Sequence, residues 1–201
     1  MIHSSFSAPG VLGRSLRALG QNVPLVLLYV AITVAPGLAL LSHPGLLAPV
    51  LAIQALLGAA AGGALALGVV RRLGVVTTTL SAGRRAGHVA LATLGFVFAA
   101  AAALCLIVPG VVCMFWLVIP VAAVEHPGLL GAFRRSRDLT QGAKGTVFSV
   151  LVVLLAGNAL ALFLVAPTGG IWAVLGVNAL FGAWTAAAAA VAYFDLRAIA
   201  D

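Results

Sequence analysis

Long apolar stretches separated by short polar turns run through this chain from one end to the other. A helix needs about 20 mostly apolar residues to cross the hydrocarbon core of a membrane. Six stretches approach that length and predict membrane-spanning helices at about 24–41, 46–70, 89–108, 111–125, 148–166 and 171–193. The fourth is the shortest, so a tilted or partly embedded helix is an alternative there. The pattern predicts an all-α, polytopic membrane protein with a single domain over residues 1–201.

Shorter segments between these stretches alternate leucine with arginine at helical spacing. They predict amphipathic helices at about 10–22 and 127–141, and a third, partly apolar segment covers about 73–88. A helix with one apolar and one basic face lies in the plane of the membrane surface. Pro127 is expected at the first helical position of the second segment, and Gly142 is expected just past its end.

Turns rich in proline and glycine join the predicted spans in pairs. They lie near Pro44, Pro109 and Pro167, which are 65 and 58 residues apart. Each third of the chain thus offers a basic segment, a span, a turn and a returning span, which is a weak internal repeat of helical hairpins. We expect six transmembrane helices arranged as three hairpins with basic interfacial helices.

The distribution of charge follows the same division. The chain has 11 Lys and Arg against four Asp and Glu, and only 7% of its residues are charged. Its mean hydropathy of +1.21 exceeds what a soluble core of this length requires. All basic residues precede the first span or follow the second, fourth or sixth, and the three proline turns carry none. Because cytoplasmic loops collect Lys and Arg, both termini are expected in the cytoplasm.

Most of these basic residues are candidates to bind the headgroups of anionic lipids. Each one near an anionic surface contributes about 1 kcal/mol to membrane binding. The candidates are Arg14, Arg17, Arg71, Arg72, Arg84, Arg85, Arg134, Arg135 and Arg137. The alternative is that they only fix the topology. In so apolar a chain the basic excess favours anionic phospholipids as partners and argues against nucleic acid.

Glu125 is the one carboxylate at the edge of a predicted span, and an acid in that position is a candidate functional residue. Because the second basic helix begins beside it, an ion pair with an arginine of that helix is the leading expectation. Organisation of a headgroup or ligand, and handling of a proton or substrate, are the alternatives. Asp138, Asp195 and Arg197 are expected to be ion-paired structural anchors at the surface.

Polar and aromatic residues within the spans need partners of their own. Gln54, Asn158 and Asn178 are predicted to be buried polar residues that bond inside the bundle. Asn158 and Asn178 lie at similar distances from the turn at 167–170, so we expect them to hydrogen-bond each other, with a polar ligand as the alternative. Trp172 and Tyr193, near predicted span ends, fit an interfacial aromatic belt.

The sequence contains no recognisable catalytic or metal-binding constellation. His3, His43, His88 and His126 do not pair at metal-ligand spacing, and there is no glycine-rich phosphate loop, nucleophile elbow or carboxylate pair. We therefore expect no catalytic residues, no metal and no cofactor. Cys105 and Cys113 stand four residues to either side of the Pro109-Gly110 turn. They are expected to be either two small apolar residues of the bundle or a disulfide.

Two stretches together resemble a known bacterial membrane domain. The first contains Pro109-Gly110, Trp116, Pro120, Glu125, Gly128, Ala132, Arg134-Arg135-Ser136, Leu139-Thr140 and Gly142, and the second is Tyr193-Phe194-Asp195-Leu196-Arg197. This pattern resembles the membrane domain that precedes the catalytic barrel of some bacterial glycerophosphodiester phosphodiesterases, whose usual close is Tyr-x-Asp-Leu-Arg. The family's next glutamate and glycine are replaced here, within residues 198–201.

The resemblance implies a six-helix bundle in the bacterial inner membrane with cytoplasmic ends. These 201 residues hold no catalytic barrel, so the hydrolytic activity is not implied. The leading expectation is a non-enzymatic protein that organises or binds anionic lipid and either self-associates or serves as a subunit of a membrane complex. The alternative is a small transporter or channel component with a path lined by Gln54, Asn158, Asn178 or Glu125. A third class, a lipid-modifying enzyme, needs polar groups that converge at headgroup depth.

Overall fold

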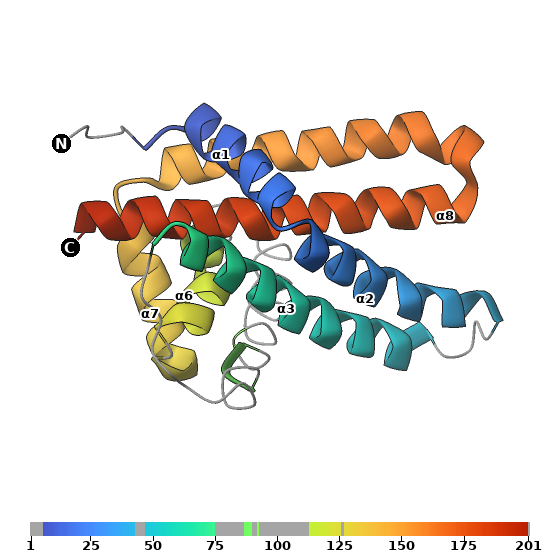
Figure 1. The fold of residues 1–201 in the computed structure, drawn as a ribbon, viewed down its shortest axis with the longest axis horizontal. Coiled ribbons are helices and arrows are strands. Elements are labelled where there is room, and N and C mark those ends of the chain that lie inside the picture. The colour runs from blue at the N-terminus through green and yellow to red at the C-terminus, as the bar shows by residue number, and fades with distance from the viewer. Residues whose placement is uncertain are drawn as a thin grey trace.

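The computed structural model describes residues 6–42, 47–74, 87–89, 92, 113–125 and 127–200, and every regular element in these ranges is α-helical (Figure 1). The helices are α1 (Ala8–Gln21), α2 (Val23–Ser42), α3 (Leu47–Arg72), α6 (Val118–Val124), α7 (Gly128–Thr140) and α8 (Lys144–Ala200). The predicted all-α class is confirmed.

Several sequence predictions fall outside the described residues. They are the third span at 89–108 and the segment at 73–88, both for the most part, together with the turns at Pro44 and Pro109, His3, His43, His126, Arg84, Arg85 and Cys105.

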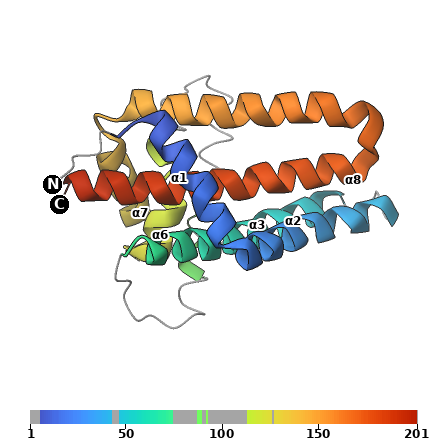
Figure 2. The ribbon, with the colours of Figure 1, turned by 45° about the horizontal axis from the view of Figure 1, so that its top comes forward.

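α8 consists of two antiparallel arms. Its backbone is non-helical at Gly170, where φ is 62°, and glycine adopts this conformation without a steric penalty. Pro167, just before the reversal, cannot donate a backbone hydrogen bond to the preceding turn. The arms 144–169 and 171–200 lie side by side in Figures 1 and 2. The segments predicted at 148–166 and 171–193 are therefore both helical and are joined as a hairpin.

α8 differs from the other described helices in its length and its apolar composition. Among the described residues it is the one helix that is long and apolar enough to cross a membrane, and a second arises if Ala8–Gln21 and Val23–Pro36, bent by 91°, form one broken span. Only 17% of the most apolar window of α8 is buried inside the protein, whereas the core helix of a soluble protein is mostly buried. The described residues thus give one or two such helices rather than six.

The fourth predicted span, 111–125, requires a correction. The apolar helix there covers Cys113–Val124, which at 1.5 Å per residue is about 18 Å long, against about 30 Å of hydrocarbon. A turn at residues 116–117 interrupts it, and Pro120 lacks the N–H that would bond the Trp116 carbonyl. Most of its residues are buried. In the structure this segment is a short helix of the protein core.

The core lies where α3, α6 and the second arm of α8 meet. α3 contacts both other elements, and Leu65, Val69, Leu117 and Val121 are almost fully buried in this region. The alanines at 187–190 are buried as well, and their small side chains permit close packing of α8 against its neighbours.

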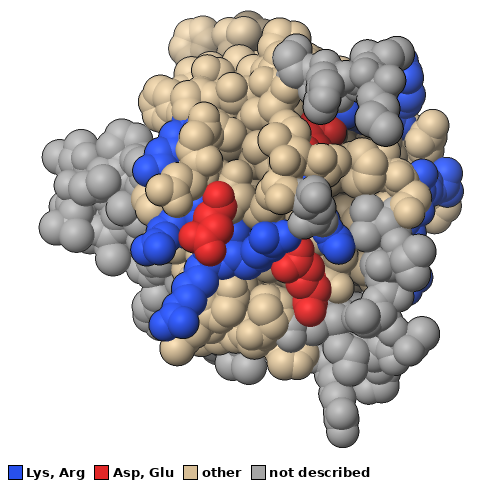
Figure 3. Space-filling model, turned by 90° about the vertical axis from the view of Figure 1, so that its left-hand side faces the viewer, with Lys and Arg blue, Asp and Glu red and all other residues tan. Residues whose placement is uncertain are grey.

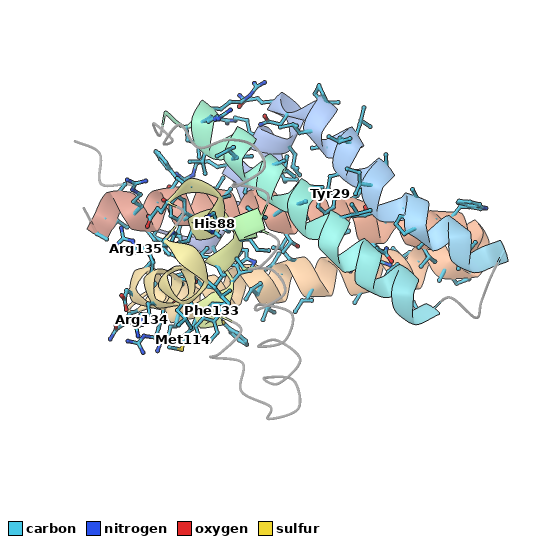
Figure 4. All side chains as sticks on the ribbon, turned by 90° about the horizontal axis from the view of Figure 1, so that it is seen from below. Tyr29, His88, Met114, Phe133, Arg134 and Arg135 are labelled. Carbon is cyan, nitrogen blue, oxygen red and sulfur yellow. The ribbon has the colours of Figure 1, made fainter. Side chains whose placement is uncertain are left out.

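A glycine makes room for an aromatic ring where α2, α3 and α8 contact one another. A Cβ at Gly182 on α8 would lie 2.7 Å from the hydroxyl oxygen of Tyr29 on α2 (Figure 4). The same ring lies 3.7 Å from the Cβ position of Gly62 on α3, which is an ordinary contact distance. Gly182 therefore accommodates the Tyr29 side chain.

Charged residues gather at one end of the bundle. The start of α1, the end of α3, α7 and both ends of α8 lie on the left in Figure 1. Figure 3, which looks onto this end, shows Lys and Arg side chains there together with Asp and Glu. The reversal of α8 at 167–170 lies at the opposite end and contains no charged residue. We call the first of these ends the charged end.

Candidate functional site at the charged end

Glu125 lies at the centre of a polar network that joins three elements. It follows α6, and its Oε1 accepts a hydrogen bond of 2.8 Å from the Tyr193 hydroxyl on α8. The Arg135 Nε of α7 lies 3.3 Å from Glu125 Oε2. Arg197, one turn beyond Tyr193, donates to the Tyr193 hydroxyl oxygen at 3.1 Å. The network fixes the connection between α6 and α7 to the C-terminal part of α8.

The surroundings of this network are only partly solvated. The side chains of Glu125 and Arg135 are 20% and 34% exposed. Tyr193 is fully buried, and a buried hydroxyl requires a hydrogen-bond partner. Because water screens these groups incompletely, the ion pair contributes more than a pair on an open surface does.

A second ion pair fastens α1 to α8. The Arg14 guanidinium binds the Asp195 carboxylate with both terminal nitrogens, of which Nη1 lies 2.6 Å from Oδ1. The Asp195 side chain is buried, and burial raises the pKa of its carboxyl above the usual value even though the Arg14 charge opposes this effect. About three turns earlier on α8, the Trp184 indole N–H donates to Ser15 Oγ at 2.9 Å. α1 is thus anchored on α8 by one charged contact and one neutral contact.

The inner side of α7 packs against the segment that precedes α6. Ala132, Ser136 and Leu139 are buried on its inner side, where Ser136 Oγ donates to the Met114 carbonyl at 2.8 Å. The Phe133 ring meets Phe115 edge-on, with ring centroids 4.9 Å apart. These contacts hold α7 against the segment that precedes α6, and Figure 4 labels Met114, Phe133, Arg134 and Arg135 in this region.

On the outer side of α7, Leu130 is 72% exposed and Arg134 and Arg137 are exposed too. These three residues are three or four positions apart, so they lie on one helix face. A leucine next to two arginines suits the boundary between hydrocarbon and headgroups. The predicted interfacial helix at 127–141 therefore has an outer face of the expected composition.

The arginines predicted to bind headgroups divide into two groups. Arg17, Arg71, Arg72, Arg134 and Arg137 are exposed, whereas Arg14 and Arg135 are half-buried in ion pairs with Asp195 and Glu125. The pair between Arg137 and Asp138 is different, because it is 3.7 Å long and both side chains are 57% exposed. Such a surface pair contributes little to stability. Asp138 is therefore a weaker anchor than the sequence predicts.

The polar residues of the spans bond in separate places. Gln54 Nε2 donates to the Thr33 carbonyl of α2 at 2.8 Å and so connects α3 to α2. Asn158 Nδ2 donates to Asn178 Oδ1 at 3.2 Å, so the predicted hydrogen bond between the α8 arms is present. None of the hydrogen bonds between described residues joins these groups to Glu125. The burial differs from the prediction, because Gln54 and Asn158 are half-buried and Asn178 is exposed.

Two residues of this site lie elsewhere than the sequence predicts. Asp195 was expected at the surface, but it is buried in its ion pair. Tyr193 is the second. It was predicted in an interfacial aromatic belt, but it is fully buried and bonded to Glu125. A signal is present in the sequence, since Tyr193 stands one helical turn before Arg197 and points to the same side of α8. Trp172, the other predicted belt residue, is exposed.

The exposed arginines of the charged end suit a phosphate oxygen. In the described ranges, no three His, Cys, Asp or Glu side chains are placed to hold a metal ion. Comparison with known proteins finds no matching family model, no matching curated protein and no matching solved structure. A function is therefore argued from the geometry of the charged end and from the surface of α8.

Proposed function

We propose that this chain is a non-enzymatic protein of the bacterial inner membrane whose charged end binds anionic lipid. The observation that carries the proposal is the sorting of charge along an exposed apolar bundle. The apolar α8 hairpin starts and ends at the charged end, and its uncharged reversal lies at the opposite end. Basic residues on one side of a bilayer produce this arrangement.

The surface of α8 supports insertion in hydrocarbon. Leu155, Phe163 and Leu164 are among its most exposed side chains. Exposed apolar area costs about 25 cal/mol per Å² in water and costs nothing against lipid tails. The proposal places the α8 hairpin across the bilayer with both termini in the cytoplasm, as the last of the hairpins that the sequence predicts.

The likeness to the membrane domain of bacterial glycerophosphodiester phosphodiesterases is also part of the proposal. Its two stretches, 109–142 and 193–197, are far apart in the sequence. Glu125 and Arg135 come from the first, Tyr193 and Arg197 come from the second, and all four belong to one polar network. Their contact gives a physical reason why a chain of this kind needs both stretches.

Lipid binding is assigned to the outer face of α7. Arg14 and Arg135 are half-buried in ion pairs. Arg134 and Arg137 are exposed beside Leu130, and the pair of Arg137 with Asp138 is long and solvated. An arginine fork binds two phosphate oxygens at once, and the leucine can enter the hydrocarbon below them. The Glu125–Arg135 pair holds α7 in the orientation that this contact requires.

Replacing both exposed arginines, as R134Q/R137Q, is expected to weaken binding of phosphatidylglycerol by about 2 kcal/mol, or about thirtyfold. The measurement is native mass spectrometry of the protein titrated with phosphatidylglycerol, and with phosphatidylcholine as the neutral reference. K144Q removes one exposed charge elsewhere at the charged end and is expected to have a smaller effect. R134K/R137K keeps both charges but loses the forks, so it should lie between the double Gln variant and the wild type. Unchanged headgroup preference in R134Q/R137Q would contradict the proposal.

A further inference from the structure

An asparagine pair on the α8 hairpin has unused hydrogen-bonding capacity. Asn158 Nδ2 donates to Asn178 Oδ1 at 3.2 Å, and Asn178 Nδ2 donates to the Val174 carbonyl at 3.1 Å. These bonds use one N–H of each amide, and a carboxamide oxygen accepts two bonds. Asn158 Oδ1 is buried without a partner, and Asn178 is exposed at the surface.

The surface around this pair is apolar. No residue from Leu155 to Asn178 is buried, although each of them is described. Six large apolar side chains in this range are 51% to 76% exposed: Leu155, Leu160, Phe163, Leu164, Ile171 and Trp172. Lipid tails can cover such side chains, but they cannot hydrogen-bond an amide.

In an inserted α8 hairpin, the asparagines would lie at a depth where water is absent. Asn178 is 8 residues and Asn158 is 12 residues from Gly170. At 1.5 Å per residue, these separations place the amides about 12 to 18 Å from the uncharged end of the hairpin. Half the thickness of a hydrocarbon core is about 15 Å. An inserted hairpin therefore carries its polar pair near the centre of the bilayer, where the remaining amide groups need a protein partner.

We propose that a second copy of this chain docks on this face of α8, with the two asparagine pairs at the centre of a two-fold interface. The inference rests on the proposed insertion of α8 in the membrane. A two-fold axis places the same patch on both copies. Asn178 can then donate its second N–H to Asn178 Oδ1 of the other copy and accept the equivalent bond in return.

A small residue suits this interface. Ala161 lies three positions after Asn158 on the same helix face, and small residues let two helix backbones approach closely in a membrane. An occupant must present both an acceptor and a donor, because the Asn178 amide supplies both. A second copy meets this condition without any further protein.

The first test measures association in lipid nanodiscs or vesicles by energy transfer between labelled copies over a range of protein-to-lipid ratios. The wild type is expected to dimerise, and Asn178→Leu is expected to lower the association constant about tenfold, since each hydrogen bond between membrane helices contributes roughly threefold. Thr185→Ala is the matched control. Its hydroxyl bonds the Phe181 carbonyl of its own helix, so association should be unchanged.

The second test locates the interface. Val174→Cys, one turn before Asn178 on the same face of α8, leaves Asn178 in place. With Cys105 and Cys113 replaced by serine, this variant is oxidised in membranes and should give a cross-linked species of twice 20.2 kDa. Leu130→Cys, exposed on α7, should not. A membrane-inserted wild type that stays monomeric would overturn the inference, and so would a dimer that Asn178→Leu leaves intact. Failure to insert in the membrane at all would instead contradict the proposed function.

Discussion

Replacing Glu125 by alanine is expected to lower the free energy of unfolding by about 2 kcal/mol. Removing one partner of a buried ion pair costs about 3 to 5 kcal/mol, and the partial exposure of Arg135 reduces that figure. The variant also leaves the buried Tyr193 hydroxyl without its acceptor. Chemical unfolding in a mild detergent, followed by tryptophan fluorescence, measures the change.

Two comparisons make this result specific to the network. Glu125→Gln keeps an oxygen that can accept from Tyr193, so its loss of stability should be smaller than that of Glu125→Ala. Asp138→Asn also removes a carboxylate from the charged end, but its partner Arg137 is solvated and stability should stay the same. If Glu125→Ala and Asp138→Asn have the same free energy of unfolding, Glu125 does not anchor the connection between α6 and α7.

A single added methyl group at Gly63 is expected to destabilise the protein by about 2 kcal/mol. Its Cβ would lie 2.5 Å from Cγ1 and 3.0 Å from Cγ2 of Val89. Valine is branched at Cβ, and few other rotamers would relieve the clash. The backbones of α3 and the 87–89 segment must therefore move apart. The same unfolding measurement applies to Gly63→Ala.

The double variant G63A/V89A separates this clash from other effects. Shortening Val89 removes the atoms that the new methyl group meets, so much of the lost stability should return relative to Val89→Ala alone. Gly176→Ala is the matched control within α8, because nothing lies within 4 Å of its Cβ position. It should leave stability unchanged or raise it slightly, since alanine is the better helix former. An equal loss for both glycine variants would show that the cost does not come from Val89.

The sequence predicted helix positions best where the hydrophobic periodicity and the proline or glycine residues at the helix ends agree. The helix expected at 10–22 is α1 at Ala8–Gln21, and the one expected at 127–141 is α7 at Gly128–Thr140. Gly142 has a φ of 98° just past the end of α7, as its position predicts. Pro127 precedes the helix instead of opening it, because Gly128 adopts a φ of 76° that turns the chain into α7.

The fourth predicted span shows what periodicity does not decide. Residues 113–124 are apolar whether they face lipid or the protein core, and a short apolar run fits both. Pro120 and the turn at 116–117 belong to the segment itself. Its burial beside α3, however, depends on residues that are distant in the sequence. Hydropathy alone therefore overestimated the number of spans that the described residues support.

The site depends on contacts between distant residues for the same reason. Arg14 and Asp195 are 181 residues apart, and no local pattern pairs one arginine in preference to its neighbour Arg17. Glu125 and Tyr193 are 68 residues apart. In contrast, Asn158 and Asn178 flank one turn at similar distances, so the geometry of a hairpin was enough to predict their hydrogen bond.

Accessibility of the two ends of the bundle to a thiol reagent that cannot cross membranes tests the proposed insertion most directly. In cells expressing single-cysteine variants in the Cys105→Ser, Cys113→Ser background, Thr168→Cys at the α8 reversal should react from outside the inner membrane. Gln141→Cys, exposed just after α7 at the charged end, should react only after the membrane is opened. Labelling of both positions from the same side of an intact membrane would contradict the insertion of α8 and the lipid-binding role that depends on it.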